Sequence, residues 1–169
     1  IEGWVMVQNP LVSVIIPTHN RSKLLKRAVD SVIGQDYANI EIIIIDDHSV
    51  DNTVCVVNEI QRQTPSLRFF QLQEKYGANA ARNYGISCAS GIYICGLDDD
   101  DEFHPERVSR LVEACRDDYA FVFSGYLHIQ NNRSTTIIHK QKYFYLDDIL
   151  GINLIGNQVL AMREKIVAV

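Results

Sequence analysis

The sequence lacks the patterns that mark several classes of protein. No apolar run in its 169 residues approaches the roughly 20 residues that a membrane helix needs, and its start does not resemble a signal peptide. Basic residues are outnumbered, with 16 lysines and arginines against 21 aspartates and glutamates and a formal net charge of −5. Because nucleic-acid binders usually display a basic face, we expect no nucleic-acid partner. We expect a cytoplasmic chain without a membrane span, and peripheral association with the inner face of the membrane stays open.

Cysteine is scarce, and the cysteines form no motif. Cys55, Cys88, Cys95 and Cys115 make no CxxC pair and have no nearby histidine set. Neither a zinc site nor a disulfide framework is therefore indicated. We interpret the four cysteines as small buried hydrophobes in a reducing compartment.

The sequence does contain enough apolar residues, 47%, to bury the core of one domain. Apolar runs predict strands at residues 12–16, 41–45, 67–72, 93–97 and 120–125. Helical patterns lie between them, at residues 22–33, 51–60, 79–89 and 104–115. This alternation predicts an α/β fold with a Rossmann-like, mostly parallel sheet and helices on both faces. The expected helix starts are an N-cap at Ser22, an N-cap at Asp51 and a first helical residue at Pro105.

The pattern weakens after residue 126. Asn131 and Asn132 indicate a hairpin turn, residues 147–150 a short helix and residues 159–162 a short strand. We expect residues 1–10 to be a lead-in segment, 11–125 a ligand-binding α/β domain and 126–169 the start of a further region.

Polar residues follow three of the predicted strands, at residues 18–20, 46–49 and 98–101. In parallel sheets, ligands bind beyond the carboxyl ends of the strands. We therefore expect these three segments to converge on one crevice.

Four consecutive aspartates, Asp98 to Asp101, end the fourth predicted strand. Neighbouring like charges raise one another's pKa, so the cluster is costly unless a cation lies among them. Mg²⁺ and Mn²⁺ favour such oxygen ligands. Side chains two apart on an extended strand point the same way, so Asp98 and Asp100 are the predicted metal ligands. The alternative is a solvated acidic loop that caps the next helix.

The other candidates have structural alternatives. Asp47 could accept hydrogen bonds from a base or ribose, whereas Asp46 is equally suited to holding its loop. Arg82 could contact a ligand or pair with the aspartates. His19 lies in a loop and could stack near a base.

Four segments together resemble the family 2 glycosyltransferases of the GT-A fold in order and spacing. They are residues 14–20 (VIIPTHN), 46–53 (DDHSVDNT), 81–85 (ARNYG) and 90–101 (SGIYICGLDDDD). The resemblance covers residues 11–125. One such motif alone would be weak, but four in register are specific.

The resemblance implies a transferase that moves sugar from a nucleotide-diphosphate sugar, most often a UDP-sugar, with inversion. The implied acceptor is a hydroxyl of a saccharide or lipid-linked saccharide. By this likeness Pro17, Thr18 and Asp47 line the nucleoside pocket, Asp99 lies near the ribose or sugar, and Asp100 ligates Mg²⁺ or Mn²⁺ at the diphosphate. The remaining expected donor contacts are His19, Asn20, Asp46, Arg82 and Asp98.

The sequence departs from the family's pattern in one respect. In the family the catalytic base lies downstream of a segment like residues 156–163, and we expect it beyond Val169, so that this chain is a shortened catalytic domain. Two alternatives stay open, a non-catalytic nucleotide-sugar-binding module and a nucleotidyltransferase related to sugar-nucleotide pyrophosphorylases. The second normally has a glycine-rich, basic phosphate loop after the first strand, which residues 17–21 do not form.

Overall fold

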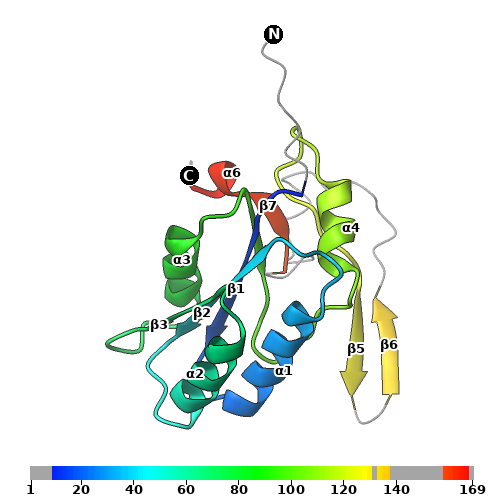
Figure 1. Cartoon of the computed structure of the whole chain (residues 1–169). Helices are drawn as coiled ribbons and strands as arrows, with labels where there is room; N and C mark the ends of the chain where they lie inside the picture. Colours follow the sequence, from blue (N-terminus) through cyan, green and yellow to red (C-terminus); the bar gives the residue numbers. More distant parts are fainter. Residues whose placement is uncertain (1–8, 131–132, 138–157, 168–169) are drawn as a thin grey trace.

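The computed structural model describes residues 9–130, 133–137 and 158–167 (Figure 1). Within these residues, five strands form one sheet in the order β3-β2-β1-β4-β7. The first four strands in this order run parallel, and β7, the last, pairs antiparallel with β4. Their bounds are β1 Val12–Thr18, β2 Ile40–Asp46, β3 Leu67–Gln71, β4 Tyr93–Gly96 and β7 Leu160–Met162. The predicted α/β fold with a mostly parallel sheet is confirmed.

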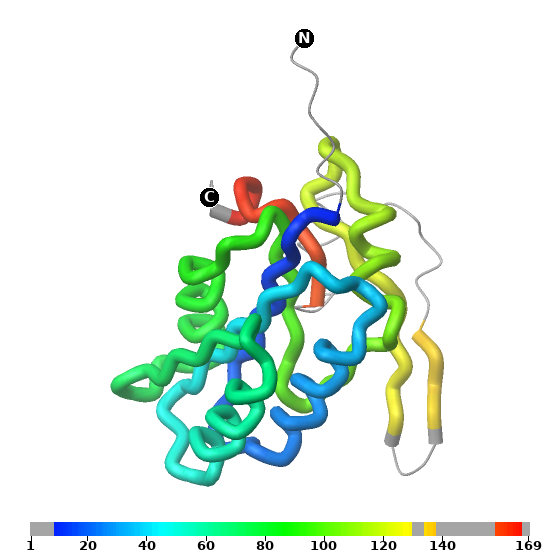
Figure 2. The backbone as a smooth tube through the Cα atoms, viewed as in Figure 1, coloured from blue at the N-terminus to red at the C-terminus, as the bar shows by residue number. Residues whose placement is uncertain are grey.

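Helices cover both faces of the sheet (Figures 1 and 2). Side chains of β2 alternate between two apolar clusters, with Ile42 and Ile44 in one and Ile43 and Ile45 in the other. The strand is a continuous apolar run because its side chains on each face of the sheet are buried against helices. The first cluster includes side chains of α1 (Ser22–Ile33), α2 (Thr53–Gln63) and α4 (Arg107–Ala114), and the second those of α3 (Ala78–Cys88) and α6 (Arg163–Val167).

Residues 120–125 do not form the predicted fifth strand. Only Val122 pairs, in an isolated antiparallel bridge with Leu160, through hydrogen bonds of 2.8 and 2.9 Å. The place beside β4 belongs to β7, in which Leu160 is the partner of Cys95. The prediction was wrong because a segment far along the chain occupies that edge. The predicted strand at residues 159–162 is confirmed as β7.

The chain after residue 125 also forms a hairpin. Strands β5 (Tyr126–Gln130) and β6 (Arg133–Ile137) pair antiparallel and lie at the side of the molecule (Figure 1). The predicted turn at Asn131 and Asn132 and the predicted helix at residues 147–150 lie outside the described residues. In the described part of the chain, every helix is too short or too polar to cross a membrane.

Three helix starts differ from the prediction, and at α2 the N-cap is Asn52 instead of Asp51. Ser22 is the first residue of α1 rather than its N-cap, and its N–H donates to Asp51 Oδ2 at 3.2 Å. Asp51 Oδ1 accepts from the N–H of Thr53 at 3.0 Å, so one carboxylate serves the starts of α1 and α2. Burial raises the pKa of Asp51, but a hydrogen bond from the Thr53 hydroxyl and these two backbone bonds together outweigh it and hold the pKa below its usual value. Pro105 lies two residues before α4 instead of at its first position.

The cysteines are buried to different degrees. Cys95 is fully buried, which raises the pKa of its thiol to about 11. Cys88 and Cys115 are partly buried. Cys55 is exposed on α2, so the interpretation of all four cysteines as buried hydrophobes was wrong at this position.

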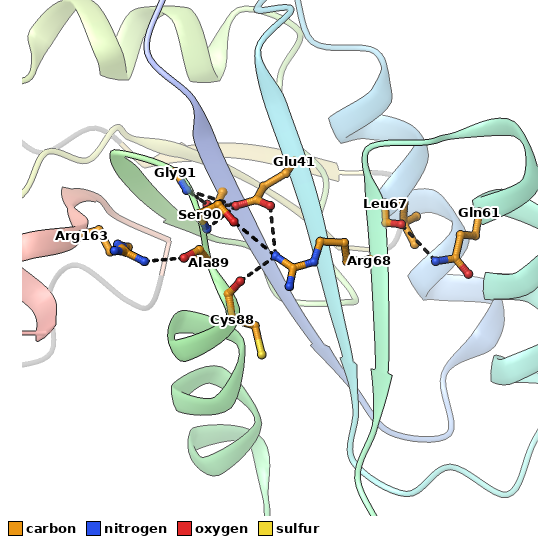
Figure 3. Close-up of polar contacts among 10 residues, drawn as sticks. Glu41, Gln61, Leu67, Arg68, Cys88, Ala89, Ser90, Gly91 and Arg163 are labelled. Atoms are coloured by element: carbon orange, nitrogen blue, oxygen red, sulfur yellow. Dashed lines mark hydrogen bonds and ion pairs between the residues drawn. The ribbon is translucent and has the colours of Figure 1, made fainter.

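A buried carboxylate lies near the amino ends of the strands. Glu41 Oε1 accepts hydrogen bonds from Ser13 Oγ at 2.6 Å, from the N–H of Ser90 at 2.6 Å and from the N–H of Gly91 at 3.1 Å. Arg68 Nη1 contacts the other carboxylate oxygen at 3.4 Å (Figure 3). We call these five residues the amino-end cluster. Burial raises the pKa of Glu41, but the hydrogen bonds together leave it below its ordinary value.

Candidate functional site

The loops after β1 and β2 are joined through Asn20. Its side-chain oxygen accepts from the N–H of Val50 at 2.8 Å, and its own N–H donates to Ser49 Oγ at 2.8 Å. The residue has a φ of +56°, a left-handed conformation that asparagine tolerates better than most side chains. A backbone hydrogen bond of 2.8 Å from Asp47 to Thr18 adds to the contact. Two of the three polar segments therefore converge as predicted.

The third segment joins them through Thr18. Its hydroxyl donates to Asp99 Oδ2 at 2.7 Å, and both residues are buried. The strand β1 can reach this contact because it runs two residues beyond its predicted end at Ile16. The backbone groups of Pro17, like those of Ile15 two residues earlier, are directed toward β4. The carbonyl of Ile15 accepts from Leu97, but β4 ends at Gly96, before a partner for Pro17. The missing N–H of Pro17 therefore costs no strand hydrogen bond.

Residues 98–101 form a turn, which we call the acidic turn. The N–H of Asp101 donates to the carbonyl of Asp98 at 3.1 Å, so the backbone is not extended here. Asp99 is buried, whereas the side chains of Asp98 and Asp100 are 33% and 49% exposed. The prediction that Asp98 and Asp100 share a direction assumed an extended strand end, and that assumption was wrong.

Two arginines lie against the acidic turn. Arg82 Nη2 pairs with Asp98 Oδ1 at 2.6 Å, which is the ion pair foreseen as an alternative for this residue. Arg21 Nη1 contacts Asp99 Oδ1 at 3.1 Å and Asp100 Oδ2 at 2.8 Å. The pKa of Arg21 is raised mainly by the negative charge of Asp99 and, to a smaller extent, by the hydrogen bond to Asp99.

Sequence reasoning missed Arg21. It directly precedes α1, where a basic side chain opposes the helix dipole. A cation in that position signals an acidic partner elsewhere in the fold, and this signal could have been used.

Asp46 and Asp47 both hold loops. Asp46 is fully buried and accepts from the N–H of Ser49 and from Gln71 Nε2, each at 3.0 Å. Asp47 accepts from the backbone N–H of Tyr76 at 2.7 Å and of Gly77 at 2.8 Å. The structure therefore gives Asp47 a role at the start of α3 that the sequence did not indicate.

The remaining candidate, His19, is part-buried and held on both ring nitrogens. Its Nδ1 donates to the carbonyl of Asp47 at 2.7 Å, and its Nε2 accepts from Asn20 Nδ2 at 3.1 Å. These two contacts fix the ring at the junction of the first two loops.

Asp101 is connected to the segment before β7. Gln158 Nε2 donates to Asp101 Oδ2, and Arg107 Nη2 donates to the carbonyl of Gln158 at 2.6 Å. Arg107 also lies over the ring of Phe103, 5.0 Å from its centroid. Burial, together with the charges of its aspartate neighbours, raises the pKa of Asp101. Gln158 lies within residues 156–163, which sequence reasoning used only as a landmark of the family, and its contact with Asp101 could not be predicted because the two residues meet only through the fold.

The described residues contain no group of three or more histidine, cysteine, aspartate or glutamate side chains placed to enclose a metal ion. A cation at the acidic turn would therefore need oxygen ligands from a bound molecule or water as well. This is how Mg²⁺ is commonly held, by one or two carboxylates together with substrate phosphates.

Comparisons with known proteins identify the family of the chain. The sequence model of the family described as Glycosyl transferase family 2 matches residues 13–163. A relative from Campylobacter jejuni subsp. jejuni, GalNAc(5)-diNAcBac-PP-undecaprenol beta-1,3-glucosyltransferase, is 40% identical over 119 residues, which are 70% of this chain and 38% of that protein.

Two solved structures share the fold. Mannosyltransferase PcManGT from Pyrobaculum calidifontis, in complex with GDP-Man and Mn²⁺, has a TM-score of 0.72 at 18% identity, over 95% of this chain and 46% of that one. TarS 1–349 from S. aureus, in complex with UDP-GlcNAc, has a TM-score of 0.71 at 23% identity, over 91% and 46%. The chain thus spans less than half the length of each of these three proteins. The family match covers most of the described structure, and the chain belongs to glycosyl transferase family 2.

Proposed function

We propose that this chain binds a nucleotide-diphosphate sugar, with UDP as the nucleotide, and serves as the donor-binding part of an inverting glycosyltransferase. The observation that carries the proposal is the meeting of three strand ends at the acidic turn, joined by the buried hydrogen bond from Thr18 to Asp99. Ligands of parallel α/β sheets bind at such a place.

We assign a divalent cation, Mg²⁺ or Mn²⁺, to Asp98 and Asp100. Both side chains offer carboxylate oxygens, the ligand type that these ions prefer, and both are partly exposed. Each is held by one arginine in the described structure, so each keeps oxygen lone pairs free for a cation. When bound, the cation would offset the negative charge that grows on the departing nucleotide diphosphate.

The residues on the β1 and β2 side of the crevice are assigned to the nucleoside. Pro17 and Thr18 end β1 beside the acidic turn, and His19, Asn20, Asp46 and Asp47 form the joined loops next to them. Asp99 would face the ribose or sugar, and Arg82 would meet the donor beside Asp98.

The choice of nucleotide and of acceptor for this chain is suggested by the names of similar proteins and is open to direct test. The C. jejuni relative is named as a glucosyltransferase that acts on an undecaprenol-linked glycan. PcManGT and TarS share the fold but are in complex with GDP-Man and UDP-GlcNAc respectively, so the fold does not select the base. For this chain we propose a UDP-sugar donor and a saccharide or lipid-linked saccharide acceptor, with residues 126–169 on the acceptor side and peripheral association with the inner membrane face.

The test is calorimetric titration with UDP-, GDP- and TDP-sugars, with Mn²⁺ or with EDTA. We expect metal-dependent binding that is strongest for the UDP-sugar and at least about 100-fold weaker in Asp100→Ala, a loss of about 2.7 kcal/mol. Asp30→Ala is the matched control, because Asp30 is also about half exposed and also pairs with one cation, Lys26. Equal affinity in EDTA would contradict the metal assignment.

A further inference from the structure

We propose that Arg21 is the resident counter-ion of the acidic turn and competes with the divalent cation for Asp100. Metal ion and nucleotide diphosphate then bind together far better than either binds alone. The inference rests on the proposed function, and it assigns to Arg21 the coupling between the two ligands.

The contact geometry of Arg21 supports this role. A single nitrogen, Nη1, lies 3.1 Å from an oxygen of Asp99 and 2.8 Å from an oxygen of Asp100. It thus stands between two carboxylates, as a bound cation would. Both contacts are made by a guanidinium nitrogen, so the two aspartates meet a positive charge there.

The two carboxylates differ in how firmly they are held. Asp99 is 7% exposed, and its second oxygen accepts from Thr18, so it is fixed with or without Arg21. Asp100 is 49% exposed, as is Arg21, and an ion pair this open to water contributes about 0–1 kcal/mol. A divalent ion can therefore displace Arg21 from Asp100 at small cost while Asp99 keeps its place.

The charges of the site explain why the two ligands would bind together. Asp98, Asp99 and Asp100 are paired with Arg21 and Arg82, and Asp101 accepts from uncharged Gln158, so the acidic turn keeps an excess of negative charge. A divalent cation alone would have to displace a positive group, and a diphosphate alone would meet the negative excess. Bound together, they bring opposite charges and leave the balance unchanged. Arg21, once displaced from Asp100, offers a guanidinium suited to phosphate oxygens.

The experiment measures Mn²⁺ binding by the electron paramagnetic resonance signal of free Mn²⁺, with and without UDP. In wild type we expect weak binding of Mn²⁺ alone and a large gain when UDP is added. In Arg21→Gln, Mn²⁺ alone should bind about 5-fold more tightly, and the gain from UDP should fall about 5-fold, which corresponds to about 1 kcal/mol. Arg21→Lys keeps the charge, so its affinity for Mn²⁺ alone should stay within about 3-fold of wild type.

The control is Arg27→Gln. Arg27 pairs with Glu102, directly after the acidic turn, so this variant removes the same charge nearby without touching Asp99 or Asp100. We expect less than about a 3-fold change in the affinity for Mn²⁺ alone and in the gain from UDP. Thermal unfolding of each variant checks that the fold is retained.

The possible results separate the two proposals. Absence of Mn²⁺–UDP binding in wild type would remove the proposed function and this inference together. Normal wild-type binding with Arg21→Gln indistinguishable from Arg27→Gln would overturn only the inference. Loss of Mn²⁺ binding in a folded Arg21→Gln variant would also overturn it, because Arg21 would then assist the metal instead of competing with it.

Discussion

The two ends of the sheet use the same chemical groups in different ways. In the amino-end cluster Glu41 is 8% exposed, and its carboxylate accepts from a hydroxyl, two backbone N–H groups and an arginine. In the acidic turn Asp100 is 49% exposed and pairs with Arg21 alone. A buried carboxylate with four donors fixes the chain around it, whereas an exposed one with a single exposed partner is available to a ligand. Pairing with arginine therefore does not distinguish Glu41 from Asp100, whereas burial and the number of donors do.

The largest expected effect is at the amino end, in Gly91→Ala. A β-carbon at this position would lie 2.8 Å from the carbonyl oxygen of Leu11 and 2.8 Å from the backbone nitrogen of Ser13, and neither backbone atom can move easily. We expect a loss of about 3 kcal/mol in the free energy of unfolding, measured by urea denaturation. Gly34→Ala is the control, since its nearest neighbour would lie at 3.4 Å. Equal midpoints for the two variants would show that the amino end is not tightly packed.

The next effect is that of Glu41→Gln, for which we expect a loss of about 2 kcal/mol at pH 7. Because the folded pKa of Glu41 lies below its ordinary value of 4.5, its contribution is present above that value and is lost as the pH falls through the lower folded pKa. The stability gap between wild type and variant should therefore narrow below about pH 4.5. Exposed Glu59→Gln on α2 should leave both the stability and its pH dependence unchanged. A gap that stays constant down to pH 3 would mean that Glu41 is not stabilised by its charge.

The smallest expected effect on stability is that of Asp100→Ala. We expect a change within about 0.5 kcal/mol, because one exposed ion pair is lost and repulsion within the acidic turn is relieved. The variant combines this small change with the large loss of donor binding predicted above. Destabilisation as great as that of Glu41→Gln, measured by the same urea denaturation, would remove the distinction between the two ends of the sheet.

Much of the fold could be predicted from local patterns. The isoleucine run of β2 identified a strand buried on both faces, and the polar residues after β1, β2 and β4 identified three loops that contact one another. These predictions succeeded because strand ends and crossover helices are set by nearby residues. The convergence of the three loops followed from the parallel topology alone.

The parts that failed depend on contacts between distant segments. Residues 120–125 are as apolar as a strand, but β7 takes the edge of the sheet. Arg21 and Asp99 are far apart in sequence and meet only when β1 and β4 are neighbours. Buried Glu41 could not be foreseen either, since its donors come from β1, β3 and the segment before β4.

The carboxylate shared by the starts of α1 and α2 has a consequence for how a phosphate could be held. In many nucleotide-binding folds a diphosphate sits on the free amides of a helix start, where the helix dipole attracts it. Here Asp51 already accepts the N–H of Ser22 and of Thr53 and places a negative charge at both helix starts. An anionic ligand is repelled from these two helix starts, so we expect the proposed recognition of a pyrophosphate to depend on cations rather than on the dipoles of α1 and α2.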